Sequence, residues 1–169
     1  MDVKDAIFGR ASVRSFTDEQ VTDAQVECLL RAAMAAPSAG NQQPWCFYVV
    51  RDAALRAQLA AASPYAKAAA KAPVVVVACS QPEAARFPQN VPQDMGAACE
   101  NLLLAAVDEG LGAVWLGIAP EPERMEGVAK ALDLPAATEP FALIAVGHPA
   151  QEPHPKGAER YDEGRVRWL

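Results

Sequence analysis

A short basic segment near the amino terminus carries side chains suited to binding an anion. Arg10, Ser12 and Arg14 alternate along it, and in an extended chain residues two positions apart point to the same side. Two guanidinium groups and a hydroxyl on one side form a phosphate receptor, because guanidinium binds phosphate oxygens through paired hydrogen bonds. A solvated basic loop is the alternative interpretation, and spacing alone favours that alternative.

Residues 37–45, with the sequence Pro-Ser-Ala-Gly-Asn-Gln-Gln-Pro-Trp, combine small side chains with side-chain amides. The segment lies between the end of a predicted helix and a predicted buried strand. Amides both donate and accept hydrogen bonds, so they suit a planar heterocycle whose edge alternates donors and acceptors. A turn whose amides satisfy its own backbone is an equally good interpretation.

Residues 110–117, with the sequence Gly-Leu-Gly-Ala-Val-Trp-Leu-Gly, fit neither common nucleotide-binding motif. They follow a predicted helix and enter a strand, whereas the dinucleotide motif requires the strand first. A P-loop requires Lys and then Ser or Thr, but Ile118 follows Gly117. The pattern predicts a helix stop and a strand, with Gly117 allowing a ligand to approach the backbone closely.

Neither the cysteines nor the histidines form a metal-binding motif. The cysteines are Cys28, Cys46, Cys79 and Cys99. They lack C-x-x-C spacing and lie among apolar residues, which favours buried free thiols in a reducing compartment. A redox role for Cys46, inside the amide-rich region, is the alternative. His148 and His154 lack partners at ligand spacing, so we expect no metal and two solvated imidazoles.

Apolar periodicity predicts helices and strands that alternate along one domain. The expected helices are residues 2–8, 22–36, 52–60, 63–71, 94–109 and 122–132. The expected strands are residues 45–50, 74–79, 113–118 and 141–146, with a short one at 165–168. This order predicts a sheet covered by helices, of the α/β or α+β class, and leaves strand direction open.

Composition excludes several classes of protein. A formal charge of −6 argues against nucleic-acid binding, although a local basic pocket is still allowed. No segment approaches the roughly 20 apolar residues of a membrane span, and the first residues do not form a signal peptide, so we expect a cytoplasmic protein. Residues 81–92 carry three prolines and predict a lid-like loop. The polar tail after residue 149 has no core of its own, so it is either frayed or docked on another surface.

Taken together, these segments resemble the nitroreductase family of flavoproteins. The resemblance rests on residues 10–16 (RASVRSF), 36–45 (APSAGNQQPW), Asp94 with 101–106 (NLLLAA), 110–117 (GLGAVWLG) and 146–149 (VGHP). It covers essentially the whole chain, and its first two motifs are specific in combination.

The resemblance implies an α+β fold in which a mixed sheet is flanked by helices and two chains intertwine as a homodimer. Residues 1–169 would form a single FMN-binding domain, with residues 149–169 as an arm that contacts the partner subunit. FMN would lie at the subunit interface.

The resemblance also implies roles for individual residues. Arg10 and Ser12 would hold the FMN phosphate, and Arg14 would face the pyrimidine end of the flavin. Residues 37–39 would come from the partner subunit and pack near the ring, whose edge Asn41 and Gln43 would help to fix. The implied cofactor-binding residues are Arg10, Ser12, Arg14, Pro37, Ser38, Ala39, Asn41, Gln43, Lys67, Trp115, Leu116, Gly117, Ile118, Lys156 and Arg160.

Two of these assignments concern the flavin ring, and one concerns the tail. The backbone near Gly117 and Ile118 would reach flavin N5, and Lys67 would approach the pyrimidine carbonyl. Family members often carry two basic residues two positions apart in the tail, whereas this chain has Lys156 with Arg160 four positions later. Either Arg160 replaces the missing contact or the phosphate is held less firmly, and we favour Arg160.

The implied activity is transfer of electrons from NADH or NADPH, through FMN, to nitroaromatic, quinone or similar small acceptors in ping-pong turnover. No side chain is expected to act as a catalytic acid or base, because flavin N5 carries the hydride. Alternatives are another reaction on the same fold (enone reduction, dehalogenation or flavin consumption), an FMN-binding electron-transfer or storage protein, and a structural domain without a cofactor.

Overall fold

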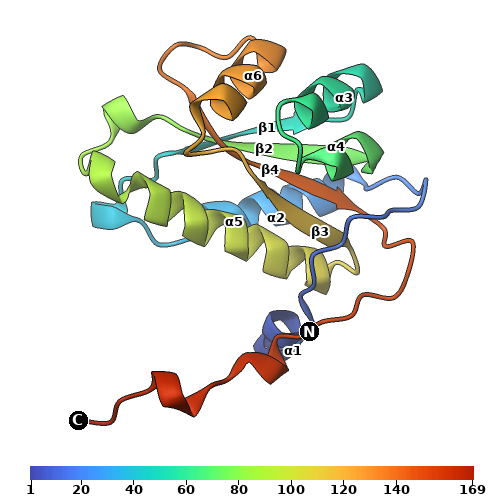
Figure 1. The fold of residues 1–169 in the computed structure, drawn as a ribbon, viewed down its shortest axis with the longest axis vertical. Coiled ribbons are helices and arrows are strands. Elements are labelled where there is room, and N and C mark those ends of the chain that lie inside the picture. Colours follow the sequence, from blue (N-terminus) through green and yellow to red (C-terminus); the bar gives the residue numbers. More distant parts are fainter.

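The computed structural model describes all 169 residues and has a four-stranded sheet at its centre (Figure 1). The strands are β1 (Trp45–Val50), β2 (Val74–Ser80), β3 (Gly112–Gly117) and β4 (Glu139–Gly147), in the spatial order β1-β2-β4-β3. All three pairings between strands are antiparallel. The parallel component of the expected mixed sheet is reduced to one isolated bridge, between Ser12 and Ala113.

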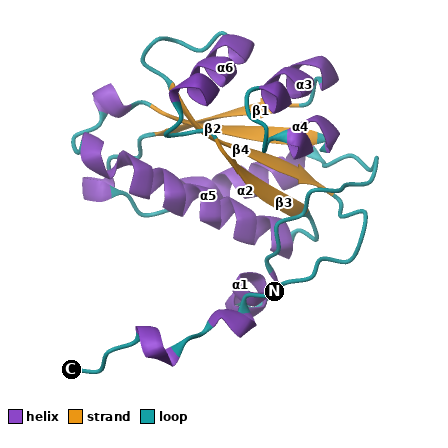
Figure 2. Ribbon diagram, viewed as in Figure 1, coloured by secondary structure: helices purple, strands orange, loops and turns teal.

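Helices cover both faces of the sheet (Figure 2). These helices are α2 (Asp23–Met34), α3 (Ala53–Ala61), α4 (Lys67–Lys71), α5 (Val91–Asp108) and α6 (Pro122–Leu132), whereas α1 (Val3–Gly9) lies away from the sheet. The first core contains α2, α5 and one face of β2, and the second contains α3, α4, α6 and the other face of β2. Strand β2 is buried at every position, as a continuous β-branched run predicts for a central strand.

Most expected elements are confirmed, and the differences lie at their ends. Helix α6 spans the expected residues, whereas α5 begins at Val91 rather than Asp94, because Pro92 is tolerated in a first turn. Residues 81–90 form two 3₁₀ turns in an otherwise irregular segment. The expected strand at residues 165–168 is wrong: a 3₁₀ turn at Glu163–Arg165 stands there, with no neighbouring strand for it to pair with.

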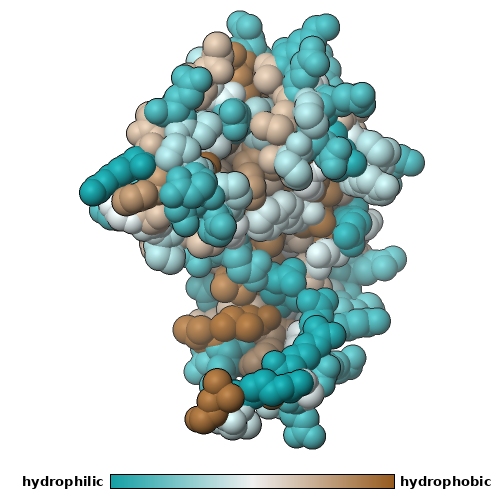
Figure 3. Space-filling view, turned by 60° about the vertical axis from the view of Figure 1, so that its left-hand side comes forward, coloured by the Kyte–Doolittle hydropathy of each residue, from teal (hydrophilic) through white to brown (hydrophobic).

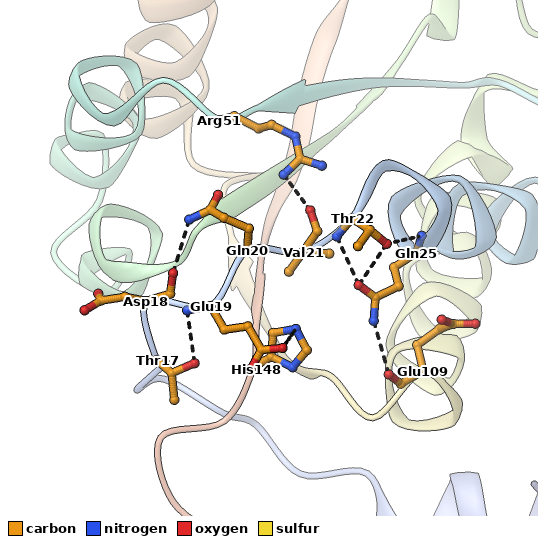
Figure 4. A network of polar contacts seen from close by, with 10 residues as sticks. All are labelled: Thr17, Asp18, Glu19, Gln20, Val21, Thr22, Gln25, Arg51, Glu109 and His148. Carbon is orange, nitrogen blue, oxygen red and sulfur yellow. Dashed lines mark hydrogen bonds and ion pairs between the residues drawn. The ribbon is translucent and has the colours of Figure 1, made fainter.

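A polar network fixes the segment that follows the basic residues (Figure 4). Arg51 donates to the Val21 carbonyl over 2.8 Å. Thr22 and Gln25 form the expected capping box at the start of α2, and Gln25 also donates to the Glu109 carbonyl over 3.5 Å. The segment is thus held against the end of β1 and the end of α5.

Helix α1 and the carboxyl-terminal tail both lie below the helix-covered sheet, and the tail runs past α1 to end away from the amino terminus (Figure 1). Helix α1 has no buried residue, and its Val3, Ile7 and Phe8 are exposed. The chain ends in Trp168, which is 91% exposed, and Leu169. Apolar residues are visible at this end of the molecule in Figure 3. No helix combines the length and the apolar character that a membrane crossing requires.

Candidate functional site

The basic segment lies against the free edge of the sheet. Val13 donates to the Ala113 carbonyl over 3.0 Å, beside the bridge between Ser12 and Ala113. A Cβ atom at Gly112 would lie 2.7 Å from a Val13 methyl carbon, so a glycine is required where the segment crosses β3. The backbone contact therefore fixes how Arg10, Ser12 and Arg14 are presented.

The basic segment and the tail enclose a cavity of about 410 Å³, which we call the basic pocket. Its lining residues are Arg10, Ala11, Ser12, Val13, Arg14, Ser15, Gln151, Glu152, Pro153, His154, Lys156 and Arg160. Four of them are basic side chains and one is acidic. A chain with a formal charge of −6 thus concentrates positive charge at one place, as an anion site requires.

Two contacts orient the arginines of the basic segment. Arg10 Nε lies 3.3 Å from a carboxylate oxygen of Glu100 on α5, and this pair engages one of the five N–H donors of the guanidinium. Arg14 donates to the Ser12 carbonyl over 3.3 Å. The remaining donors are available to an anion in the basic pocket.

The tail reaches the basic pocket by a defined route. Phe16 and Pro149 form an antiparallel bridge, and Ala150 donates to the Ser15 carbonyl over 3.0 Å. Further along, Gly157 packs against α1, where an added Cβ would lie 3.4 Å from the Phe8 Cα. This route carries both Lys156 and Arg160 to the same pocket as Arg10, so the wider spacing of the two tail cations does not separate them.

Sequence reasoning missed part of this pocket. Gln151, Glu152 and His154 line it, and His154 is exposed, as expected of a solvated imidazole. The only feature of the sequence that points to these residues is their position between the strand end at Gly147 and the first tail cation, Lys156. The other histidine, His148, lies outside the pocket, with its Nε2 3.6 Å from a Glu19 carboxylate oxygen. No three His, Cys, Asp or Glu side chains converge as a metal site would require.

The amide-rich segment lies elsewhere on the subunit, and none of its residues lines the basic pocket. It forms a 3₁₀ turn, Ala39–Asn41, in which Gly40 and Asn41 have positive φ angles, as does Gln43. Gln43 donates through its backbone to Ser38 Oγ and through its side chain to Asn41 Oδ1. These contacts agree with a self-satisfied turn, yet Pro37, Asn41 and Gln43 remain exposed and available to a second molecule.

Strand β3 is an edge strand, because it pairs with β4 alone. Its outer backbone groups run from the Ser12 bridge to Gly117 and are free to bind a ligand. The Leu116 and Ile118 side chains are buried, and Trp115 packs edge-on against Phe141 with ring centroids 5.6 Å apart. The Ile118 backbone N–H donates to the Phe141 carbonyl over 3.3 Å. Because the Ala113 carbonyl faces outward and accepts from Val13, alternation along the strand also turns the backbone groups of Gly117 outward. Gly117 is therefore suited to a ligand contact, and an added Cβ there would point into open space.

Lys67 is exposed at the first residue of α4, on the opposite core layer from α5, and it does not line the basic pocket. One subunit thus brings five of the predicted residues together: Arg10, Ser12, Arg14, Lys156 and Arg160. The other predicted residues form separate groups at residues 37–43, at Lys67 and along the β3 edge.

All four cysteines are free, and Cys79 and Cys99 are buried while the other two are half-buried. Cys46 and Cys79 are direct cross-strand partners on β1 and β2. The hydrogen bond from the Cys79 thiol lowers the pKa of Cys46, while the same bond and burial raise that of Cys79. Burial raises the pKa of Cys99 to about 12.

These pKa directions predict the order of thiol modification. Because the thiolate is the reactive form, a maleimide is expected to modify Cys46 of the native protein first and Cys79 and Cys99 only after unfolding. Peptide mass mapping after timed labelling at two pH values measures this order. Equal labelling of Cys46 and Cys99 in the native protein would contradict it.

A family model, a related sequence and two solved structures all indicate the same protein family. The family model described as Nitroreductase family matches residues 7–64 and 61–148. A protein of Archaeoglobus fulgidus, provisionally named NADH dehydrogenase/NAD(P)H nitroreductase, is 40% identical over 147 residues, covering 86% of this chain and 84% of its own.

Two solved structures extend the similarity to the fold. A Bacteroides thetaiotaomicron protein with the same provisional name superposes with a TM-score of 0.92 at 38% identity, covering 98% of this chain and 96% of its own. A Desulfovibrio desulfuricans protein, provisionally described as a nitroreductase and solved in complex with FMN, gives a TM-score of 0.81 at 36% identity, with coverages of 96% and 97%.

Proposed function

Because this chain belongs to the nitroreductase family, we propose that it is an FMN-dependent oxidoreductase that takes electrons from NADH or NADPH and passes them to small acceptors. The observation that carries the proposal is the basic pocket. Four cations and the Ser12 hydroxyl surround a cavity in an acidic chain. Among them, Arg10, Ser12, Lys156 and Arg160 fit a phosphate dianion, because cationic and hydroxyl groups form short, charge-assisted bonds with phosphate oxygens.

In this proposal the chain's own residues hold the cofactor at both ends. Arg10, Ser12, Lys156 and Arg160 bind the phosphate, and the free edge of β3 runs from there to Gly117. The backbone at Gly117 and Ile118 then lies beside the redox-active part of the flavin. Arg14 and Lys67 stabilise the negative charge that develops at the pyrimidine end on reduction, because fixed cations need no reorganisation.

We propose that the site is completed by a second copy of the chain. The exposed apolar residues of α1 and the exposed end of the tail are surfaces that a partner subunit would cover. Helix α5 also leaves Leu104 and Val107 only half-buried. In the homodimer, residues 37–43 of one subunit would reach the flavin held by the basic pocket of the other, and the arm of residues 149–169 would contact the partner. Residues 1–169 of each subunit would form a single domain.

When bound, FMN would supply hydride and electron transfer between NADH or NADPH and the acceptor, and we expect alternating, ping-pong turnover. The protein needs no side-chain acid or base for these transfers if water or substrate supplies protons. Its own contribution is binding, orientation and stabilisation of charge.

The proposed acceptors are nitroaromatics, quinones or similar small molecules. A second cavity, of about 360 Å³, supports this class. It lies between the proline-rich segment 81–92 and Ala119–Pro120, directly after the proposed flavin-contacting backbone at Gly117–Ile118. Met125 and Phe141 line it, so it suits a planar apolar molecule.

Anaerobic titration tests the proposal. The purified protein is expected to bind FMN, and NADH or NADPH is expected to bleach the flavin absorption band, which an added quinone or nitroaromatic then restores. A protein that refuses FMN would overturn the proposal. Flavin that stays oxidised in excess NADH and NADPH would instead favour an electron-transfer or storage protein.

A further inference from the structure

Asp94, in the first turn of α5, is the only charged residue among the buried residues of the chain. Its side chain is 5% exposed. Burying a carboxylate is costly unless hydrogen bonds compensate it. The partners that compensate Asp94 therefore indicate what the residue does.

Both oxygens of Asp94 bond to the amide-rich segment rather than to α5. The backbone N–H of Ala39 donates to Oδ1 over 2.9 Å, across 55 positions of sequence. The side-chain amide of Gln42 donates to Oδ2 over 2.6 Å. One buried carboxylate thus holds both ends of the turn between Ala39 and Gln42.

Gln42 cannot reverse its amide, because Phe87 fixes it from the other side. The backbone N–H of Phe87 donates to Gln42 Oε1 over 2.8 Å, and Gln42 Nε2 donates to the Phe87 carbonyl over 3.2 Å. The amide nitrogen must therefore face Asp94, and the Ala39 N–H is also a donor. These two donors require two acceptor oxygens on the side chain at position 94. A carboxylate has two such oxygens, whereas an amide has one.

The turn that these bonds hold has an unfavourable backbone. Asn41 and Gln43 have φ angles of +56° and +48°, a region that side chains disfavour. Gly40, at +54°, lies under the Phe87 ring, where an added Cβ would come within 2.7 Å of it. Such a conformation persists only where its surroundings determine it.

We propose that Asp94 is a positioning residue for the cofactor: it holds residues 38–43 in the shape that the FMN of the partner subunit requires, and through Gln42 it ties that shape to segment 81–90. This inference rests on the proposed function. It adds a link between two segments, because Pro82 and Pro88 of residues 81–90 line the cavity proposed for the acceptor.

Asp94→Asn tests the role, with Asp108→Asn as the matched control. Asp108 lies on the same helix, is exposed, and contacts only the terminal amine among charged groups. Asp94→Asn is expected to raise the dissociation constant for FMN about tenfold or more, because a buried donor loses its acceptor. In Asp94→Asn, hydrogen exchange at the backbone amides of Ala39 and Phe87 should accelerate. In Asp108→Asn, FMN affinity and exchange at these amides should change little. Gln42→Ala, which leaves the Ala39 contact in place, should show a smaller rise with fast exchange at Phe87.

Subunit mixing separates this role from general damage to the fold. Arg10→Ala impairs the basic pocket but leaves the turn intact, and Asp94→Asn does the reverse. In a heterodimer carrying one variant per subunit, the basic pocket of the Asp94→Asn subunit meets an unaltered turn from its partner. Fluorescence titration of doubly tagged heterodimers should therefore recover one FMN site of wild-type affinity per dimer.

The outcomes are distinguishable. Wild-type FMN affinity and wild-type exchange in Asp94→Asn would overturn the inference and leave the proposed function standing. If Asp94→Asn binds FMN weakly and the heterodimer also lacks a site of wild-type FMN affinity, the partner-directed role of Asp94 is overturned. Failure of the wild-type protein to bind FMN would overturn the proposed function itself.

Discussion

Removal of residues 151–169 is expected to weaken FMN binding by at least roughly 100-fold, since two charge-assisted phosphate contacts are lost together. Lys156 and Arg160 are two of the four basic side chains in the basic pocket, and residues 151–154 form one of its walls. The cut after Ala150 keeps the bond from Ala150 to Ser15 and the bridge between Phe16 and Pro149. The basic segment thus remains anchored to the sheet edge, and the loss can be assigned to the arm.

Two measurements show how much of the lost FMN affinity comes from removing the tail cations and how much from weaker subunit association. Isothermal titration gives FMN affinity, and sedimentation equilibrium gives the dimer dissociation constant. The full-length double variant Lys156→Ala/Arg160→Ala removes the charge but keeps the arm, so it should lose affinity while remaining dimeric. The truncated chain should lose both. Unchanged FMN affinity after truncation would show that the tail cations do not bind the phosphate.

The truncation also tests why the tail makes so few contacts with the rest of its own chain. Residues 150–160 are anchored by few contacts, and the chain beyond Tyr161 extends away from the sheet (Figure 1). Ordering such a segment costs conformational entropy that its own subunit does not offset. In the proposed homodimer, a partner surface would supply the missing burial and so hold the polar arm in place.

Local features of the fold could be predicted from the sequence, because they depend on neighbouring residues. The capping box of Thr22 and Gln25 and the limits of α6 both follow from short-range pattern. The continuous apolar run of β2 predicted burial on both faces, which the structure confirms. The basic segment could be identified because its three polar side chains lie within five residues.

Features that join distant segments could not be predicted in the same way. The antiparallel direction of the strands, the edge position of β3 and the cavity between residues 10–15 and the tail depend on the whole chain. The sequence marks His154 only by its position before the tail cation Lys156, and that position does not indicate which segment the tail faces. Asp94 is separated from Ala39 by 55 positions, so its bonds to the turn have no signal in residue spacing. Residues 37–43 also act, in our proposal, on another molecule, and one sequence cannot position a second copy of itself.

Arg10→Ala is expected to raise the dissociation constant for FMN by about 10- to 100-fold and to leave riboflavin binding unchanged. Riboflavin lacks the phosphate, so it does not use the contact that the variant removes. The Arg10 side chain is 22% exposed, and its contact with Glu100 holds it at the mouth of the basic pocket. Loss of a partly desolvated guanidinium therefore weakens phosphate binding more than loss of a solvated one would.

Glu100 makes the prediction sharper, because Arg10→Ala leaves its carboxylate without a partner beside the proposed phosphate. Adding Glu100→Gln to the variant should recover part of the FMN affinity by removing this repulsion, although the recovery is small because Glu100 is half exposed. Arg31→Ala is the matched control: Arg31 also pairs with a glutamate, Glu27, but lies outside the pocket on α2. If Arg10→Ala weakened FMN and riboflavin equally, the arginine would be supporting the fold rather than binding the phosphate.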